Sequence, residues 1–163
     1  MPKHHATAHN YAAARQLLED LKGLPEFRAY VFPELFDNVS HSKNIEAAAA
    51  GAPCQIAVTP GGFELVNSGE LHGGALVEAG VVVYVFTSSQ YASGPAENEA
   101  VDALLVELLH TVCRFQYKPT AVHAGIAARL TGLADLDMIT EAGFTDKVAA
   151  RALSLAVRLN LSK

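Results

Sequence analysis

The chain has 163 residues, of which half are hydrophobic, and its formal net charge is −5. This length suits one domain with a sizeable core, and the hydrophobic share excludes a wholly disordered chain. Lysine and arginine form no run or stripe beside aromatic residues, which argues against binding to nucleic-acid phosphates.

The start of the chain and its apolar runs predict where the protein is found. Residues 1–9 are small, polar and histidine-containing, so we expect a flexible N-terminal arm ahead of a single domain over residues 10–163. The arm lacks the apolar core of a signal peptide, and the longest apolar run, Val81 to Phe86, is too short to span a bilayer. We therefore expect an intracellular chain with no membrane association.

The first fifty residues predict a helix and a strand. Apolar residues at the helical period predict an amphipathic helix over about residues 10–23, with Asn10 as its N-cap. Aromatic and β-branched residues from Phe27 to Phe32 predict a short strand. Residues 42–50 are compatible with a short alanine-rich helix or with a loop.

The middle of the chain predicts three strand segments. Alternation over residues 54–59 predicts a strand, and Pro60-Gly61-Gly62 predicts a turn after it. Residues 63–71 predict a weak strand or hairpin arm. Residues 76–87 are apolar on both alternating faces, which predicts a central strand covered on both sides.

A second amphipathic helix is predicted over about residues 96–113. Its broad apolar arc should pack on the sheet and consists of Val101, Leu104, Leu105, Leu108, Leu109 and Val112. Its polar side carries Glu99, Asp102, Glu107 and His110.

The last fifty residues predict a linker and then strands. The linker is expected over residues 114–125, and strand pieces are expected over residues 126–131 and 136–140, with Gly132 between them at a bulge. Apolar residues alternate from Leu153 to Leu161, which favours a closing strand over a helix. Because the strands follow one another without intervening helices, we expect an α+β fold. Its mixed, mainly antiparallel β-sheet should have the two main helices packed on one face.

The candidate catalytic and metal-binding patterns are incomplete. Glu107 and His110 have the spacing that places two di-iron ligands on one helix face, but such a site needs a second copy and further carboxylates. The two cysteines, Cys54 and Cys113, lie in apolar contexts and should be reduced and buried. We therefore expect no catalytic residue, no metal and no cofactor.

Two segments resemble a known family of phage proteins. They are the buried strand that ends in Val83-Tyr84-Val85-Phe86-Thr87-Ser88 and the leucine-rich helix from Glu99 to His110. Together with the N-terminal helix and the closing strand, they resemble the tail terminator proteins of tailed phages, in particular the Mu-like tail terminators and neck proteins. The resemblance covers residues 11–161 as a pattern of elements.

The resemblance implies a structural virion protein without enzymatic activity. Such proteins form a hexameric ring that caps the tail tube, stops its elongation and joins it to the head connector. The implied partners are further copies of the chain, tail tube and sheath proteins, and the head-tail connector. Genomic DNA would pass through the lumen without specific binding. The implied location is the tail or neck of the virion, and the host cytoplasm during assembly.

The expected interface residues lie on the predicted hairpin, on one face of the central strand and on the closing strand. The glycine-rich ends of the hairpin over residues 60–74 suit a projecting arm that contacts the tube. The residues assigned to the interface are Phe63, Glu64, Leu65, Val66, Asn67, Tyr84, Phe86 and Arg158. Three alternatives stay open. One is another neck or head-completion protein of similar fold, and the second is a small intracellular enzyme with a site around His110 and Glu107. The third is a non-viral assembly or adaptor domain.

Overall fold

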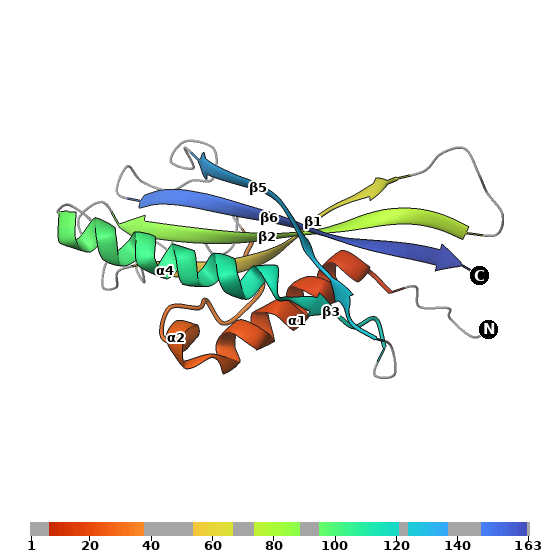
Figure 1. Cartoon of the computed structure of the whole chain (residues 1–163), viewed down its shortest axis with the longest axis horizontal. Helices are drawn as coiled ribbons and strands as arrows, with labels where there is room; N and C mark the ends of the chain where they lie inside the picture. The colour runs from red at the N-terminus through yellow and green to blue at the C-terminus, as the bar shows by residue number, and fades with distance from the viewer. Residues whose placement is uncertain are drawn as a thin grey trace.

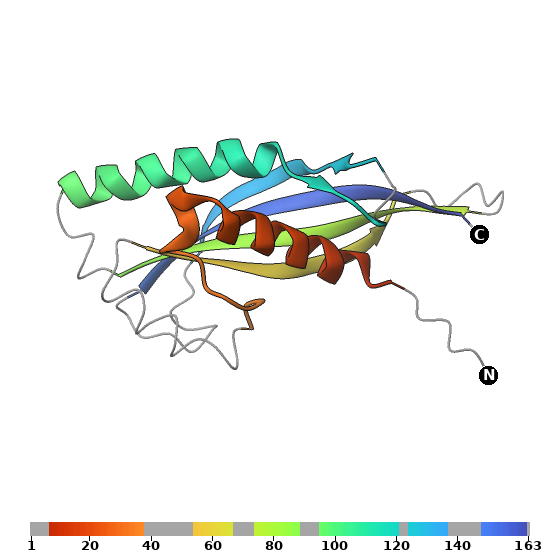
Figure 2. The same ribbon diagram turned by 90° about the horizontal axis from the view of Figure 1, so that it is seen from below.

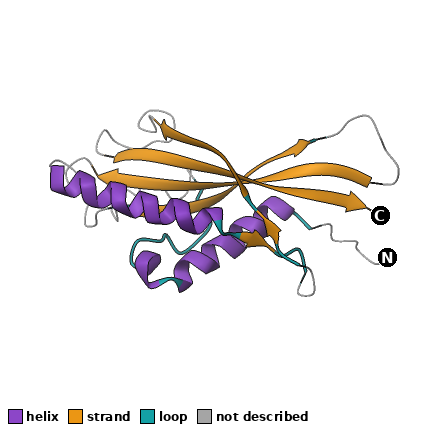
Figure 3. Cartoon of the chain, viewed as in Figure 1, coloured by secondary structure: helices purple, strands orange, loops and turns teal. Residues whose placement is uncertain are grey.

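The computed structural model describes residues 7–37, 54–66, 74–88, 95–120, 124–136 and 148–162. Figure 3 shows a layer of long strands with two long helices beside it. In chain order the elements are α1 (His9–Gly23), α2 (Pro25–Arg28), β1 (Gln55–Leu65), β2 (Gly74–Ser88), α4 (Pro95–Cys113), β3 (Gln116–Tyr117), β4 (Ile126–Ala127), β5 (Arg129–Leu136) and β6 (Val148–Ser162). Within the described residues, no helix is long and apolar enough to cross a membrane.

Four strands form one antiparallel sheet in the order β1-β2-β6-β5, and β3 pairs with β4 separately (Figure 1). The longest pairing joins β2 to β6 over fifteen residue pairs, from Gly74 opposite Ser162 to Ser88 opposite Val148. A single parallel bridge between Val31 and Ile56 adds to the edge of β1. The predicted α+β class, with a mainly antiparallel sheet, is confirmed.

Both long helices pack on the same face of the sheet, as predicted; in Figure 2, α1 crosses in front of the strands and α4 runs above them. We call this side the helix face. Alternate residues of the two central strands, β2 and β6, point to it and are buried against the helices, which explains the period-two pattern that predicted β6. The buried residues of β2 and β6 on this face are Val77, Ala79, Val81, Val83, Val85, Leu153, Leu155, Val157 and Leu159, and those of the helices include Leu17, Leu21, Leu105, Leu108 and Val112.

Among the described residues, side chains cover the opposite face of the sheet at one end only. Phe36 packs there on Phe86 and Tyr84, with ring centroids 5.2 and 5.7 Å apart. Further along β2 the same face carries Glu78, Gly80 and a half-buried Val82. The prediction that the central strand is covered on both sides is therefore right for its second half alone.

The segment after α1 differs from its prediction. Pro25 lies at the start of the one-turn helix α2, which buries Phe27. Proline favours a first helical turn because its fixed φ suits the helix and its missing N–H is not needed there. After α2 the chain runs beside β1, where it forms one isolated bridge, Val31–Ile56, and no strand. The predicted strand over residues 27–32 is therefore wrong.

The predicted turn at Pro60-Gly61-Gly62 is also wrong, because β1 runs through it. The register with β2 shifts by one residue between Pro60 and Phe63, which is a β-bulge. Asn10 does not cap α1, whose N-cap is Ala8. Its side-chain amide instead donates a 2.8 Å hydrogen bond to the carbonyl oxygen of Gly61, so α1 is tied to the bulge.

The second half of the chain contains two further differences. The expected linker includes Phe115 and Tyr117, which are buried in the core, and β3 within it. The strand β5 continues through Gly132, with its register shift between Leu130 and Gly132, so the bulge is confirmed but the break into two strands is wrong. The predictions for residues 1–6, 42–50, 67–71 and 137–140 lie outside the described residues.

The two cysteines behave differently from one another. Both are free thiols, and Cys54 is buried as predicted. Burial raises the pKa of Cys54 to about 12. Cys113 is exposed at the end of α4, so the prediction that it is buried is wrong.

Close backbone packing at the bulge gives a test of the fold. A Cβ atom added to Gly61 would lie 2.9 Å from the carbonyl carbon of Gly80, whereas one added to Gly62 would meet nothing within 4 Å. We expect Gly61→Ala to lower the free energy of unfolding by about 1–3 kcal/mol, because backbone atoms of β2 would have to move. Urea unfolding measures the change, with Gly62→Ala as the matched control. Equal effects of the two substitutions would contradict the packing described.

Candidate assembly surface

One end of the sheet extends past the helices. Figure 1 shows β1, β2 and β6 continuing together toward the end where both chain termini lie. We define the arm as residues 63–66, 74–79 and 157–162. Its strands are held in register by the pairs Phe63–Ala79, Leu65–Val77 and Val77–Leu159, among others. The arm is therefore a three-stranded extension of the main sheet and not an isolated hairpin, which would be marginally stable in water.

The edge of the arm exposes apolar side chains. Phe63, Leu65 and Val66 are 46%, 58% and 39% exposed. Three large apolar residues within four positions form a patch of the kind that marks a contact with another protein. Glu64, between them, is also exposed, and Asn67 lies outside the described residues.

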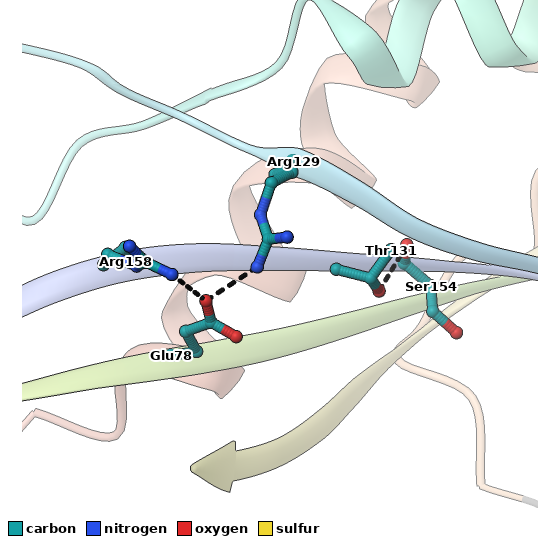
Figure 4. A network of polar contacts seen from close by, with 5 residues as sticks. All are labelled: Glu78, Arg129, Thr131, Ser154 and Arg158. Carbon is teal, nitrogen blue, oxygen red and sulfur yellow. Dashed lines mark hydrogen bonds and ion pairs between the residues drawn. The ribbon is translucent and has the colours of Figure 1, made fainter. Parts of the chain in front are cut away.

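The face of the sheet that points away from the helices carries, at the arm, a network of charges that crosses three strands. Arg158 on β6 and Arg129 on β5 each donate through Nη2 to Oε1 of Glu78 on β2, at 2.9 and 2.7 Å (Figure 4). Arg158 lies directly opposite Glu78 in the register, whereas Arg129 lies opposite Ala156. The small side chain of Ala156 lets the guanidinium of Arg129 pass over β6 to reach Glu78.

The two arginines control the ionisation of Glu78, whose side chain is only 16% exposed. The hydrogen bond from Arg158 is the largest cause that lowers its pKa, and burial acts in the opposite direction. The hydrogen bond from Arg129 and the two positive charges add to the lowering. Glu78 is therefore held ionised as a bridge between β2, β6 and β5.

A groove of about 350 Å³ lies beside this network. Its residues come from all four strands, and most of them are small, which leaves space above the sheet. Thr131 bounds it at the β5 bulge, where its hydroxyl donates to the carbonyl oxygen of Ser154 at 3.1 Å. The lining residues include Gly61, Gly62, Glu64, Glu78, Gly80, Thr131, Ser154 and Ala156.

The remaining expected interface residues have different environments. The ring of Tyr84 stacks on that of Phe86 at 5.5 Å, and burial raises the pKa of Tyr84. Phe86 is fully buried, so it supports the sheet from within and does not lie on the surface. The side chain of Arg158 is 55% exposed although it is bonded to Glu78.

Glu107 and His110 lie on the exposed side of α4, as the helical pattern predicted. Neither side chain lines the groove beside Glu78 or the two other grooves found on the described surface. Among the described residues, no three histidine, cysteine, aspartate or glutamate side chains are placed to hold a metal ion.

The sequence analysis missed the network around Glu78. Its partners Arg129 and Arg158 are 51 and 80 positions away in sequence, so no local spacing could reveal them. The one available signal was the position of Glu78 in an otherwise apolar central strand, where an acid requires a partner.

The lowered pKa of Glu78 predicts how stability depends on pH. A carboxyl group with a lower pKa in the folded state stabilises the fold above its unfolded value, near 4.5, and this stabilisation is lost as the pH falls through the folded pKa. We expect Glu78→Gln to lower the urea midpoint at pH 7, and the difference from the wild type to shrink below pH 4.5.

The matched control for Glu78→Gln is Glu64→Gln. Glu64 lies directly opposite Glu78, and like charges in that position repel each other. Glu64→Gln should therefore not reduce stability at pH 7. A loss in Glu78→Gln that stays constant from pH 7 to pH 3 would show that the ionised carboxylate is not the cause.

Comparisons with known proteins identify no family for this chain. No protein family and no curated protein matches the sequence. Among solved structures, the chain is similar to one from the "virion of native gene transfer agent (GTA) particle", with 15% identity and a TM-score of 0.42. That similarity covers 95% of this chain and 99% of the other.

Proposed function

We propose that this chain is a structural virion protein that acts as a tail terminator. Copies of it form a ring on the last ring of the tail tube, and the ring stops further addition of tube subunits. Its other side joins the tail to the head connector. This work requires surfaces of the right shape, and no bond is made or broken.

The arm is the observation that carries the proposal. It presents Phe63, Leu65 and Val66 to solvent at the end of a sheet that extends past both helices. Exposed apolar residues on a paired, three-stranded extension suit a permanent contact with another protein better than they suit a substrate site. We assign the arm to the tail tube.

The charges of the chain suit a ring through which DNA passes. The net charge is −5, so the surface as a whole does not attract phosphates. Three arginines in the described part of the chain are paired with acids. Arg129 and Arg158 pair with Glu78, and Arg151 pairs with Asp102 at 2.7 Å. A lumen formed by such surfaces would let DNA slide without specific binding.

Tube length gives the functional test. The tail tube protein of the phage or prophage that encodes this chain is produced with and without it, and tubes are measured by electron microscopy. We expect short, capped tubes with the wild-type chain and long, uncapped tubes with the double variant Phe63→Ser, Leu65→Ser. Removing the apolar patch should weaken docking while leaving the buried core intact.

The control for the patch is Val106→Ser. Val106 is 50% exposed on α4, outside the arm, so it changes the same chemistry without touching the proposed contact. Tubes of equal length with and without the wild-type chain would exclude a terminator. If heads and tails then also fail to join without the chain, the head-completion alternative takes its place.

A further inference from the structure

The groove beside Glu78 crosses the strands at a level where the sheet lacks large side chains. Its floor is formed at Gly80 and Ala156, which lie directly opposite each other on β2 and β6. Gly61 and Gly62 continue the groove to the outer edge of the sheet, at the bulge of β1. The groove therefore reaches the edge of β1 at the point where the arm begins.

Two carboxylates, those of Glu64 and Glu78, form one wall of this groove. The two residues lie directly opposite each other on β1 and β2, so their side chains point to the same face of the sheet. Both arginines bond to Oε1 of Glu78, whereas its Oε2 and the carboxylate of Glu64 accept no hydrogen bond from the described part of the chain. Figure 4 shows Oε2 on the side of the carboxylate that faces Thr131 and Ser154, which also line the groove.

The carboxylate of Glu64 destabilises the isolated chain. Like charges directly opposite each other repel, and the two arginines compensate Glu78 from the side of β6 and β5, away from Glu64. The row of charges across the sheet therefore ends in an uncompensated acid at the edge of β1. An acid that weakens the fold, with no cation beside it in the described chain, is expected where a partner protein supplies the opposite charge.

We propose that this groove receives a lysine or arginine side chain of the tail tube protein, whose cationic group lies between Glu64 and Oε2 of Glu78. The inference rests on the proposed terminator function and deepens it, because it names a contact through which the chain recognises the tube. The apolar stem of such a side chain would lie over Gly80 and Ala156, where no side chain larger than a methyl group stands in its way.

The position of Glu64 connects the groove to the surface already assigned to the tube. Glu64 lies between Phe63 and Leu65, whose side chains point to the other face of β1 because side chains alternate along a strand. A tube subunit that covers the exposed edge of β1 would therefore meet apolar side chains on one face and the acid on the other. The cation site is thus a second part of the same docking surface.

A cationic side chain fits these groups better than a metal ion or an anion does. Ca²⁺ and Mg²⁺ take about six oxygen ligands or more, and no three acidic, histidine or cysteine side chains of the described residues are placed to hold a metal. An anion in the groove would be repelled by Glu64. A lysine or arginine side chain needs acceptors alone, which the two carboxylates and the hydroxyl of Ser154 provide.

The position of the two acids in a groove makes the contact stronger than an ordinary surface ion pair. Pairs of fully exposed charges contribute little to binding or stability. The side chain of Glu78 is only 16% exposed, so a cation beside it would be partly shielded from water once a tube subunit covers the groove. Removing one partner of a charge pair enclosed in an interface weakens binding strongly. The loss of the Glu64 charge should therefore be visible in tube capping.

Capping by the variant Glu64→Gln tests the contact. The tube protein of the phage or prophage that encodes this chain is assembled with increasing amounts of wild type or variant, and electron microscopy gives the concentration that caps half of the tubes. We expect Glu64→Gln to raise this concentration by about tenfold or more at about 0.1 M salt, and the difference to shrink as salt is added.

Two controls separate docking from folding and from general charge effects. Because Glu64→Gln removes a repulsion, urea unfolding should show no loss of stability, so weaker capping cannot come from unfolding. Glu107→Gln removes the same charge on the exposed side of α4, away from the groove, and should cap like the wild type.

Charge exchange identifies the occupant of the groove. Each exposed lysine and arginine of the tube protein is changed to glutamate in turn and tested with the wild-type chain and with Glu64→Lys. One tube variant should escape capping by the wild type and be capped by Glu64→Lys. If no tube variant does so, or if Glu64→Gln caps at the wild-type concentration, the inference is overturned while the terminator role stands. An effect of Glu64→Gln on self-association of the chain without tubes would assign the groove to a neighbouring copy and would also overturn it. Tubes that the wild-type chain never caps would refute the role itself.

Discussion

The fifteen-residue pairing of β2 with β6 is the constraint on which the rest of the structure depends. It joins two segments that are separated along the chain by α4 and β5, and it forms the middle of the sheet. Both strands extend past the part of the sheet that the helices cover (Figure 1). They form the core where the helices cover them, and they form the arm beyond the helices. One pairing thus produces both the buried core and the projecting arm.

The two faces of the paired strands β2 and β6 stabilise the fold in different ways. On the helix face, valine and leucine bury against α1 and α4, and each such side chain contributes about 1.5–3 kcal/mol through its removal from water. On the opposite face, Gly80 and Ala156 leave a groove, and Glu78 links three strands through its two arginines. The outer strands β1 and β5 flank this central pair, and each is joined to it by an antiparallel pairing.

The long elements could be predicted because their patterns are repeated many times. The alternation in β6 and the apolar arc of α4 each extend over several periods, so chance matches are unlikely to mislead. Short segments could not be predicted in this way. An aromatic residue such as Phe27 suits a strand and a one-turn helix equally, and here Pro25 favours the helix because it starts α2. Two adjacent glycines fit a turn as well as a bulge, and only the close approach of Gly61 to Gly80 requires the bulge. The exposed arm residues followed from the hairpin pattern, whereas the partners of Glu78 depend on strand order, which no local pattern contains.

The central claim is that copies of this chain form a ring that ends the tail tube. Electron cryomicroscopy of tube ends formed in the presence of the chain tests it most directly, at a resolution that separates strands. The account predicts a single closed ring at one end of each tube, with the arm against the last tube subunits. Copies spread along the tube wall, or a ring whose arms point away from the tube, would contradict it.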